Sequence, residues 1–371
     1  MSESENAPTN DLQVSSNGFY SYHSPEDEPR QYRLHLRILP DQSGILIINA
    51  RSTLRLNQTA TYLAWLKIQG KSEPEIVAEA LKRYQVEEDK LISDLQKFNL
   101  QILNIINNPD QAPFITGTDF DSDATERPSG LPLRVNLCLT TQDETLPQTE
   151  TEELSTENWK EIIQKTYDAG IPQVIFMGGE PVLRPDLTEL LEFTEALGMV
   201  SGLLTSTKKL YEDESFLERV LESGLDHLIL EVDPELPQIS NQLQKIFDKD
   251  LFTCVRFPVY HDSNLADWAI ALIQNGCNAL SFYAATLDAN DRSALLNQQL
   301  TAQNVLIEYD LPFSVQAIQA DQPVALFSPE ISQLESNHYT VMPDGMLCPQ
   351  DFTAKPLGSL LTSSWNELIV K

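Results

Sequence analysis

The chain has 371 residues, of which 41% are hydrophobic, and a formal net charge of −30. This length suffices for two or three domains with a substantial core. The acidic balance argues against a nucleic-acid partner, because such binding needs clustered Lys and Arg. The sequence has no apolar run long enough to span a membrane and no signal peptide, so we expect a cytoplasmic protein without membrane partners.

The charge is unevenly distributed along the chain. Residues 1–29 hold six acids and no Lys or Arg, and this composition predicts a disordered acidic tail. Residues 30–107 have a net charge of +3, whereas residues 108–371 have a net charge of −27. Solubility explains such an asymmetry; the alternative is that the basic module docks on the acidic part or prefers an acidic peptide.

The basic module combines a strand pattern with a helix pattern. Apolar residues alternate in three short runs and then recur at helical spacing in three longer ones. We predict strands at 33–39, 45–48 and 53–56, and helices beginning at Asn57, Ser72 and about Glu87. Three strands followed by three helices are the layout of a winged-helix α+β domain over residues 30–107.

The next 216 residues follow a different pattern. Residues 108–130 hold five acids without periodicity and are predicted to be a linker. From residue 131 to residue 323, apolar strands alternate with helices, which is typical of an α/β fold with a parallel sheet. Strands are predicted at 133–139, 173–177, 200–205, 227–232, 252–259 and 278–283, and helices near 156–169, 186–197, 213–223, 238–249, 264–275 and 290–303. Six such units suggest a partial barrel with any site at the carboxyl ends of its strands.

A short motif follows the second of these strands. Gly178 and Gly179 lack a Cβ, so the backbone there can approach a ligand closely. Glu180 offers a carboxylate that suits an ammonium group, and Pro181 fixes the exit of the chain. Taken alone, the same four residues are more often a tight turn between a strand and a helix.

Several segments together resemble known families. The order of residues from Leu56 to Leu95 resembles the PqqD family, a peptide-recognition domain of ribosomal peptide maturation. The strand at 131–137, the Gly178–Pro181 motif, and the later strands resemble radical SAM enzymes, and residues 324–371, with Pro343-Asp344-Gly345, resemble their SPASM-type extension. This resemblance covers nearly all of residues 30–371 and implies a partial (β/α)6 TIM-like barrel between the two smaller regions. It identifies Gly178, Gly179, Glu180 and Pro181 as a residual SAM-binding motif.

The sequence departs from the radical SAM pattern at three places. Cys-x3-Cys-x2-Cys after the first strand is replaced by Asp143, Pro147 and Glu150, and iron–sulfur clusters are normally held by cysteine thiolates. The ribose-contacting serine of the fourth strand is replaced by Glu231, and only Cys348 remains in the SPASM-like region. We therefore expect no catalytic residues, no metal site, no cofactor, at most weak SAM binding, and no [4Fe–4S] cluster.

These observations lead to three functional hypotheses. The first is a catalytically degenerate radical SAM-like protein that binds a peptide or protein partner as a scaffold or accessory in ribosomal peptide or protein modification, alone or beside an active homologue. Its peptide would add a strand near Thr53 and Arg55, against the third helix near Lys90 and Lys97. The alternatives are a radical SAM enzyme with an atypical iron–sulfur site, and a cluster-free binder of SAM or an amino-acid-like ligand.

Overall fold

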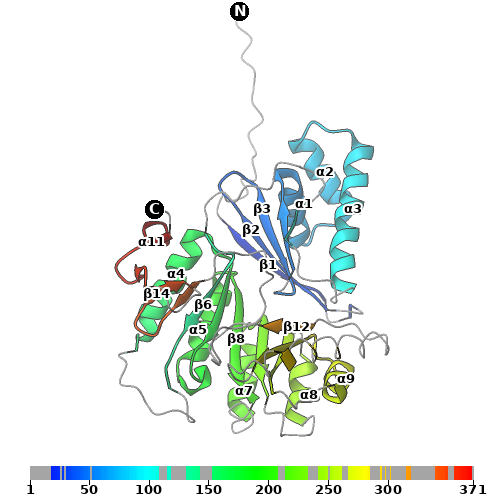
Figure 1. Ribbon diagram of the computed structural model, residues 1–371. Helices are drawn as coiled ribbons and strands as arrows, with labels where there is room; N and C mark the ends of the chain where they lie inside the picture. The colour runs from blue at the N-terminus through cyan, green and yellow to red at the C-terminus, as the bar shows by residue number, and fades with distance from the viewer. Residues whose placement is uncertain are drawn as a thin grey trace, which may run out of the picture.

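The protein contains two β-sheets, each with its own helices (Figure 1). The smaller sheet has five strands in the order β1-β2-β3-β4-β5. The larger sheet has ten strands in the order β12-β11-β10-β9-β8-β7-β6-β13-β14-β15. The computed structural model describes residues 18–25, 27–28, 31–50, 52–107, 115–117, 131–142, 153–207, 214–232, 241–249, 251–260, 266–284, 293–294, 297, 301, 315–318, 339–349 and 355–369.

The smaller sheet belongs to the basic module. Its antiparallel strands are β1 (Phe19–His23), β2 (Arg33–Ile38), β3 (Gly44–Ile48) and β4 (Ser52–Leu56), and β5 (Ile115–Gly117) is added in parallel to β4. Leucines and isoleucines at alternate positions of β2, β3 and β4 pack against the helices α1 (Gln58–Ile68), α2 (Glu73–Arg83) and α3 (Glu88–Asn107).

Local capping explains where two of these helices begin. The Asn57 side chain accepts a hydrogen bond from the backbone N–H of Ala60, and Ser72 and Glu75 form a capping box at the start of α2. The three predicted helices are therefore present. Two predictions about the module's flanks differ from the structure: β1 lies inside the segment expected to be a disordered tail, and β5 lies inside the expected linker.

The larger sheet contains the predicted alternation of strands and helices. Seven parallel strands follow one another in sequence order, and helices on the outside connect them. The strands are β6 (Arg134–Cys138), β7 (Gln173–Met177), β8 (Val200–Ser206), β9 (His227–Glu231), β10 (Phe252–Val259), β11 (Ala279–Ala284) and β12 (Val315–Ile318). The helices are α4 (Thr156–Ala169), α5 (Leu187–Ala196), α7 (Glu214–Glu222), α8 (Asn241–Phe247) and α9 (Ala266–Gln274). An α/β fold with a parallel-rich sheet is thus confirmed, while most of the helix expected at 290–303 lies outside the described residues.

The C-terminal segment extends the larger sheet. β13 (Tyr339–Val341) pairs in parallel with β6, and β14 (Met346–Pro349) and β15 (Gly358–Ser359) continue antiparallel. Gly345 has a φ of 82°, which the turn between β13 and β14 requires. The short helix α11 (Trp365–Ile369) buries Trp365 against α4, where its indole N–H donates to Thr166 Oγ1 at 3.1 Å. This hairpin therefore shares a hydrophobic core with the parallel strands.

The basic module docks on the amino ends of the larger sheet's strands. Ile47 and Ala50 pack against Val200, the first residue of β8, and the Gln173 amide at the start of β7 donates to the Ala50 carbonyl at 3.2 Å. No helix in the described part of the chain is both long enough and apolar enough to span a bilayer.

Charged groups also contribute to this contact between the basic module and the larger sheet. Arg33 of β2 lies 3.0 Å from Asp226, which is 1% exposed and precedes β9. Asp226 also accepts the backbone N–H of Ser201 at 3.0 Å and lies 3.3 Å from His35 Nε2. Burial lowers the pKa of His35, so its ring tends to be neutral while Arg33 carries the positive charge.

Candidate functional site

The Gly178–Pro181 motif forms the turn that leaves β7. Gly178 and Gly179 have φ values of 93° and 48°, which side chains with a Cβ rarely adopt. A Cβ on Gly178 would collide with Cys138 Sγ and lie 3.0 Å from Cys138 Cα. A Cβ on Gly179 would collide with the backbone carbonyl of Gln142. The open side of both glycines is therefore filled by the chain's own segment after β6.

The Glu180 carboxylate points toward the carboxyl end of the neighbouring strand β8. It is 7% exposed and accepts hydrogen bonds from the Thr205 hydroxyl at 2.5 Å and the Ser206 backbone N–H at 3.0 Å, both at the end of β8. It also accepts from the Val182 N–H at 3.4 Å as the cap of the 3₁₀ turn Pro181–Leu183. Glu180 thus ties β7 to β8, and its oxygens are already used within the protein.

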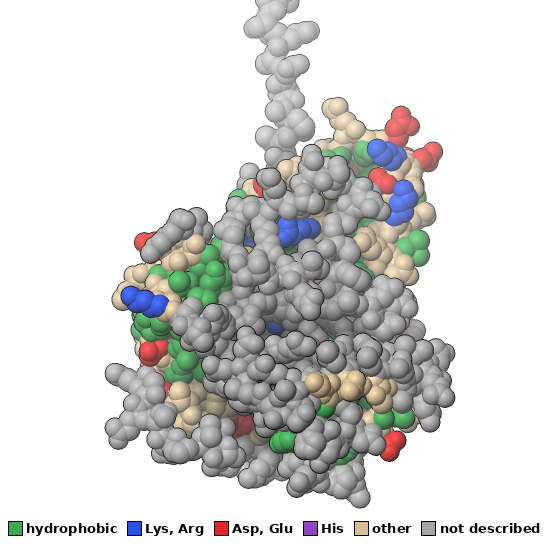
Figure 2. Space-filling view, viewed as in Figure 1, with side chains coloured by type: hydrophobic (Ala, Val, Ile, Leu, Met, Phe, Trp, Pro, Cys, Tyr) green, Lys and Arg blue, Asp and Glu red, His purple; other side chains and the backbone are tan. Residues whose placement is uncertain are grey.

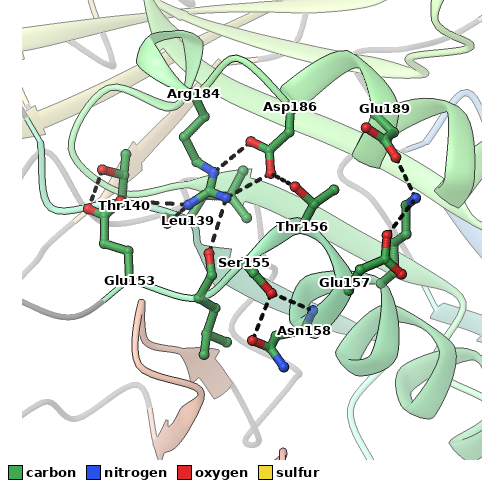
Figure 3. A network of polar contacts seen from close by, with 12 residues as sticks. Leu139, Thr140, Glu153, Ser155, Thr156, Glu157, Asn158, Arg184, Asp186 and Glu189 are labelled. Carbon is green, nitrogen blue, oxygen red and sulfur yellow. Dashed lines mark hydrogen bonds and ion pairs between the residues drawn. The ribbon is translucent and has the colours of Figure 1, made fainter.

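An Arg184-centred network fixes the segment after β6 (Figure 3). The guanidinium donates to both carboxylate oxygens of Asp186, at 3.0 and 2.8 Å, and to the carbonyls of Leu139 and Leu154, at 3.2 Å each. Glu153 accepts from the Thr140 hydroxyl at 2.6 Å and lies 3.6 Å from Arg184. Residues 139–142 and 153–154 are consequently held together at the carboxyl edge of β6, on either side of the undescribed residues 143–152.

A polar layer crosses the carboxyl ends of β8 to β11. Strand register places Ser206 beside Glu231, Glu231 beside Arg256, and Arg256 beside Ser281. Two residues earlier on the same face, the strands carry the apolar cluster of Leu204, Ile229, Cys254 and Ala279. The polar layer therefore lies next to an apolar cluster at the carboxyl ends of parallel strands, where α/β sheets bind their ligands.

Arg256 is the unusual member of this layer. It is 1% exposed; its guanidinium lies over the Tyr283 ring at 4.2 Å and 3.9 Å from Glu231 Oε2. Its Nε and Nη1 atoms are buried without a hydrogen-bond partner among the described residues. Tyr283 donates to Glu231 Oε1 at 3.0 Å, and burial and this carboxylate raise the pKa of Tyr283 well above its ordinary range. A buried cation with unused donors fits a ligand oxygen that carries negative charge.

Sequence reasoning missed Arg256, although a signal was present. Arg256 is the one charged residue in the otherwise apolar or uncharged strand Phe252–Val259. Such a residue in a buried strand is seldom placed there without a partner. Arg184 and Asp186 were missed because their roles depend on chain segments that are far apart in sequence.

The described residues do not supply a ligand set for an iron–sulfur cluster. Within them, no group of three or more His, Cys, Asp or Glu could hold a metal ion. Cys138, Cys254, Cys277 and Cys348 are buried and form no disulfide bond. Burial, with nearby Glu153, raises the pKa of Cys138 to about 12. Asp143, Pro147 and Glu150 lie outside the described residues.

The four predicted peptide-binding residues divide between two faces of the small sheet. Thr53 and Arg55 pair with Ile47 and Ile45 of β3, and these isoleucines belong to the face that packs on the larger sheet. Lys90 and Lys97 are exposed on α3, which packs on the opposite face, and Lys97 lies 3.7 Å from Asp94. Figure 2 shows acidic and basic side chains side by side over α2 and α3.

Comparison with known proteins gives partial relatives by sequence. No protein-family model matches the chain. The PqqA peptide cyclase of Xanthomonas euvesicatoria pv. vesicatoria is 41% identical over 81 residues, which are 22% of this chain and 21% of that protein. The PqqA peptide cyclase of Gluconobacter oxydans is 42% identical over 78 residues, 21% of each. The chain thus matches about a fifth of the length of these curated relatives.

Comparison of structures covers most of the chain. Streptococcus suis SuiB bound to S-adenosylmethionine has a TM-score of 0.54 and 13% identity over 90% of this chain and 86% of that one. SuiB bound to its precursor peptide SuiA has a TM-score of 0.54 and 12% identity over 91% and 87%. At such low identity this similarity establishes a common fold.

The expectation that no cofactor accompanies this chain is contradicted by these relatives. A protein of the same fold has been solved with S-adenosylmethionine bound, and a segment of the chain is homologous to PqqA peptide cyclase. The expectation weighed the changes after the first strand, at Glu231 of the fourth strand and in the SPASM-like region, and did not consider Arg256. The buried guanidinium and the Glu231 carboxylate fit the charged groups of an amino-acid-like ligand such as SAM. The chain is thus similar to PqqA peptide cyclase over about a fifth of its length and to SuiB in its fold.

Proposed function

We propose that this protein binds a peptide as a scaffold or accessory protein in ribosomal peptide or protein modification, and that the peptide adds a strand to the outer edge of β4. The observation that carries the proposal is the pairing of β4 with β5: Thr53, Leu54 and Arg55 pair in parallel with Ile115, Thr116 and Gly117. An edge that accepts a strand from elsewhere in the chain has backbone groups suited to this kind of pairing.

The face of β4 indicates what such a peptide would contact. Thr53 and Arg55 are half-buried on the side of the sheet that faces the amino ends of the larger sheet, and Leu54 and Leu56 are buried against the helices. Main-chain hydrogen bonds would supply affinity, and the Arg55 guanidinium would favour a peptide with an acidic residue in register. The net charge of +3 over residues 30–107 supports the same preference.

The position of the basic module supports a role in binding a peptide away from the polar layer. The module is anchored at the amino ends of β7, β8 and β9 through Asp226 and Gln173, whereas the polar layer with Arg256 lies at the carboxyl ends. Five-residue strands separate the two, so a peptide bound at β4 begins about 17 Å or more from that layer. Glu180 is committed to hydrogen bonds within the protein, which supports an accessory role beside an active homologue.

Peptide titration tests this proposal directly. Precursor peptides encoded beside the gene would be titrated against the full chain by fluorescence anisotropy, with Arg55→Glu as the variant and Arg83→Glu as the matched control. Arg83 carries the same charge on the helical side, stacked at 4.6 Å on Tyr62. We expect Arg55→Glu to weaken binding at least about tenfold and Arg83→Glu to change it less than about twofold. Equal effects of the two variants, or no binding by any peptide, would contradict the proposal.

A second function is favoured by the orphaned nitrogens of Arg256. The protein would bind SAM or another amino-acid-like ligand at the polar layer, with Arg256 pairing with a carboxylate and Glu231 accepting from an ammonium group. When bound, SAM would supply its sulfonium chemistry; this chain's residues would orient the amino-acid end. Tyr283, which donates to Glu231, would hold that carboxylate in place.

Calorimetry with SAM and with methionine tests this second function. We expect binding that Glu231→Gln weakens about tenfold, or about 1.4 kcal/mol, because the amide does not pair with an ammonium group as strongly. Glu189→Gln, on the exposed surface of α5, is the control and should bind as the wild type does. Binding that is unchanged by Glu231→Gln would assign the ligand to another place.

A further inference from the structure

The edge of β4 is occupied in this structure by the chain's own β5. The strand is three residues long, so it covers Thr53 to Arg55 and leaves Ser52 and Leu56 beyond its ends. Three residues form only a few ladder hydrogen bonds, each with a net contribution of about 1 kcal/mol. The contact of β5 with β4 is therefore weak by itself.

The connection to α3 compensates for this weakness. β5 begins eight residues after Asn107, the last residue of α3, so its tether holds it close to the β4 edge. A short covalent connection raises the effective concentration of a segment to about the millimolar range. A three-residue strand can then remain paired although the same segment, free in solution, would bind poorly.

Opposite charges also favour the pairing of β5 with β4. Residues 108–130, which include β5, hold five acids and one Arg, whereas residues 30–107 have a net charge of +3. A segment of negative charge is thus added to a module of positive charge, as an acidic peptide would be. This attraction weakens with increasing salt concentration.

β5 also lies between the two parts of the protein along the chain. Gly117 is separated by 16 residues from Arg134, the first residue of β6, which begins the larger sheet. Ile115 and Gly117 are in register with Thr53 and Arg55, on the face of the small sheet that packs against the larger one. Release of β5 would therefore unpair residues 115–117 at the place where the two parts meet.

We propose that β5 is a resident competitor for the strand-accepting edge of β4, so that an external peptide binds only by displacing residues 115–117. This inference rests on the proposed peptide-binding function. A peptide that pairs with all five residues of β4 would gain hydrogen bonds that β5 does not make, and it would release the segment leading to β6. The edge thereby selects peptides longer than the three-residue resident.

The test uses the chain's own sequence as the probe. A fluorescent synthetic peptide of residues 111–121 would be titrated against the full wild-type chain and against Thr116→Pro, because proline removes a backbone N–H from β5 and breaks its pairing. Ser122→Pro, in the same linker but outside β5, is the matched control. We expect Thr116→Pro to bind the peptide at least about tenfold more tightly than the wild type and the control.

Hydrogen exchange gives an independent measurement on the same proteins. The backbone amides of residues 52–56 should exchange faster in Thr116→Pro than in the wild type and slow down again when the peptide is added. A variant with a Gly-Ser segment of equal length in place of residues 113–118 should behave as Thr116→Pro does, which guards against a folding defect of the proline variant. Equal affinity in wild type and Thr116→Pro, or unchanged exchange at residues 52–56, would overturn the inference.

The same design separates this inference from the proposed function. If the probe peptide discriminates between the variants as expected but precursor peptides bind equally to wild type and Thr116→Pro, the edge is gated by β5 and the precursor binds elsewhere. That result would contradict the proposed function. If precursor peptides also bind more tightly to Thr116→Pro, both are supported.

Discussion

The two ends of the large parallel sheet are built in different ways. At the amino end, Asp226 is nearly inaccessible and is paired with Arg33, His35 and the Ser201 N–H, and apolar side chains of the basic module cover the strands. At the carboxyl end, Arg256 is equally buried, but two of its nitrogen atoms have no hydrogen-bond partner among the described residues. Asp226 is therefore a structural anchor, whereas Arg256 is a candidate contact for a ligand.

The carboxyl end itself divides into two halves. At β7 and β8, Glu180 and the two glycines are fully occupied by contacts within the chain. At β9 to β11, Arg256 lies beside Glu231 and Tyr283, and its Nε and Nη1 atoms have no hydrogen-bond partner among the described residues. This difference moves the ligand-binding hypothesis from the glycine motif to the carboxyl ends of β9, β10 and β11.

Substitution of Gly179 should have the largest effect and tests the claim that the glycine turn is structural. Gly179→Ala would place a Cβ against the Gln142 carbonyl, with the Gln142 and Thr141 carbonyl carbons at 2.9 and 3.0 Å, at a φ of 48°. We expect a loss of about 3 kcal/mol or more in the free energy of unfolding, because backbone must move and the φ is unfavourable. Thermal unfolding midpoints would measure the effect.

Gly70→Ala is the matched control for this prediction. Gly70 also has a positive φ, 73°, but a Cβ there would meet nothing within 4 Å. It should cost only about 1 kcal/mol, which is the conformational penalty alone. Similar losses for the two variants would mean that the segment after β6 adapts easily, and the Gly178–Gly179 turn would again be available to a ligand.

Asp226→Asn tests the anchoring of the basic module. The amide would leave the Arg33 guanidinium, 13% exposed, without its buried anion. Removal of one partner of a buried pair costs about 3 kcal/mol, and the thermal midpoint should fall accordingly. Glu189→Gln removes one carboxylate from an exposed pair with Lys160 and should cost less than about 1 kcal/mol. A loss for Asp226→Asn as small as that of the control would show that apolar packing alone holds the module.

Much of the fold could be predicted from sequence because the patterns are local. The strands at 173–177 and 227–232 and the helix at 156–169 have continuous apolar runs or clear helical spacing, and the structure places elements there. The two short strands at the module's flanks were missed because their stability is not local. Phe19–His23 and Ile115–Gly117 form strands through pairing with β2 and β4, and neither has a long alternating pattern.

The site was harder to predict than the fold. Gly178–Pro181 is a contiguous motif and was identified, but its contacts with Cys138 and Gln142 depend on how β6 lies beside β7. Arg256 and Tyr283 are 27 positions apart and meet only because β10 and β11 are neighbours. Whether a charged residue is satisfied depends on such neighbours, so sequence alone could not distinguish Glu180 from Arg256.

The smallest predicted effect concerns Glu195, beside the buried Asp226. Burial, together with the Asp226 charge and against the opposing effect of Arg33, raises the pKa of Glu195 to about 7 from an ordinary 4.5. Between these two pH values, the folded protein binds a proton that the unfolded chain does not. The contribution of Glu195 to stability is therefore most favourable below about pH 4.5, decreases as pH rises, and is lowest above about pH 7.

Glu195→Gln removes this titration and should stabilise the protein in alkaline solution. Glu195 Oε2 is buried without a hydrogen-bond partner among the described residues, so the neutral amide avoids the cost of a buried charge near Asp226. Since the side chain is partly exposed, solvent reduces the gain to about 1–2 kcal/mol at pH 8, and it should vanish near pH 4. Thermal midpoints of the variant and wild type from pH 4 to 8 would measure it. Glu192→Gln, exposed on the same helix, should give a pH-independent difference near zero. A constant gain for Glu195→Gln across this range would mean that the amino end of the sheet tolerates a second carboxylate charge, and that Arg33 balances both.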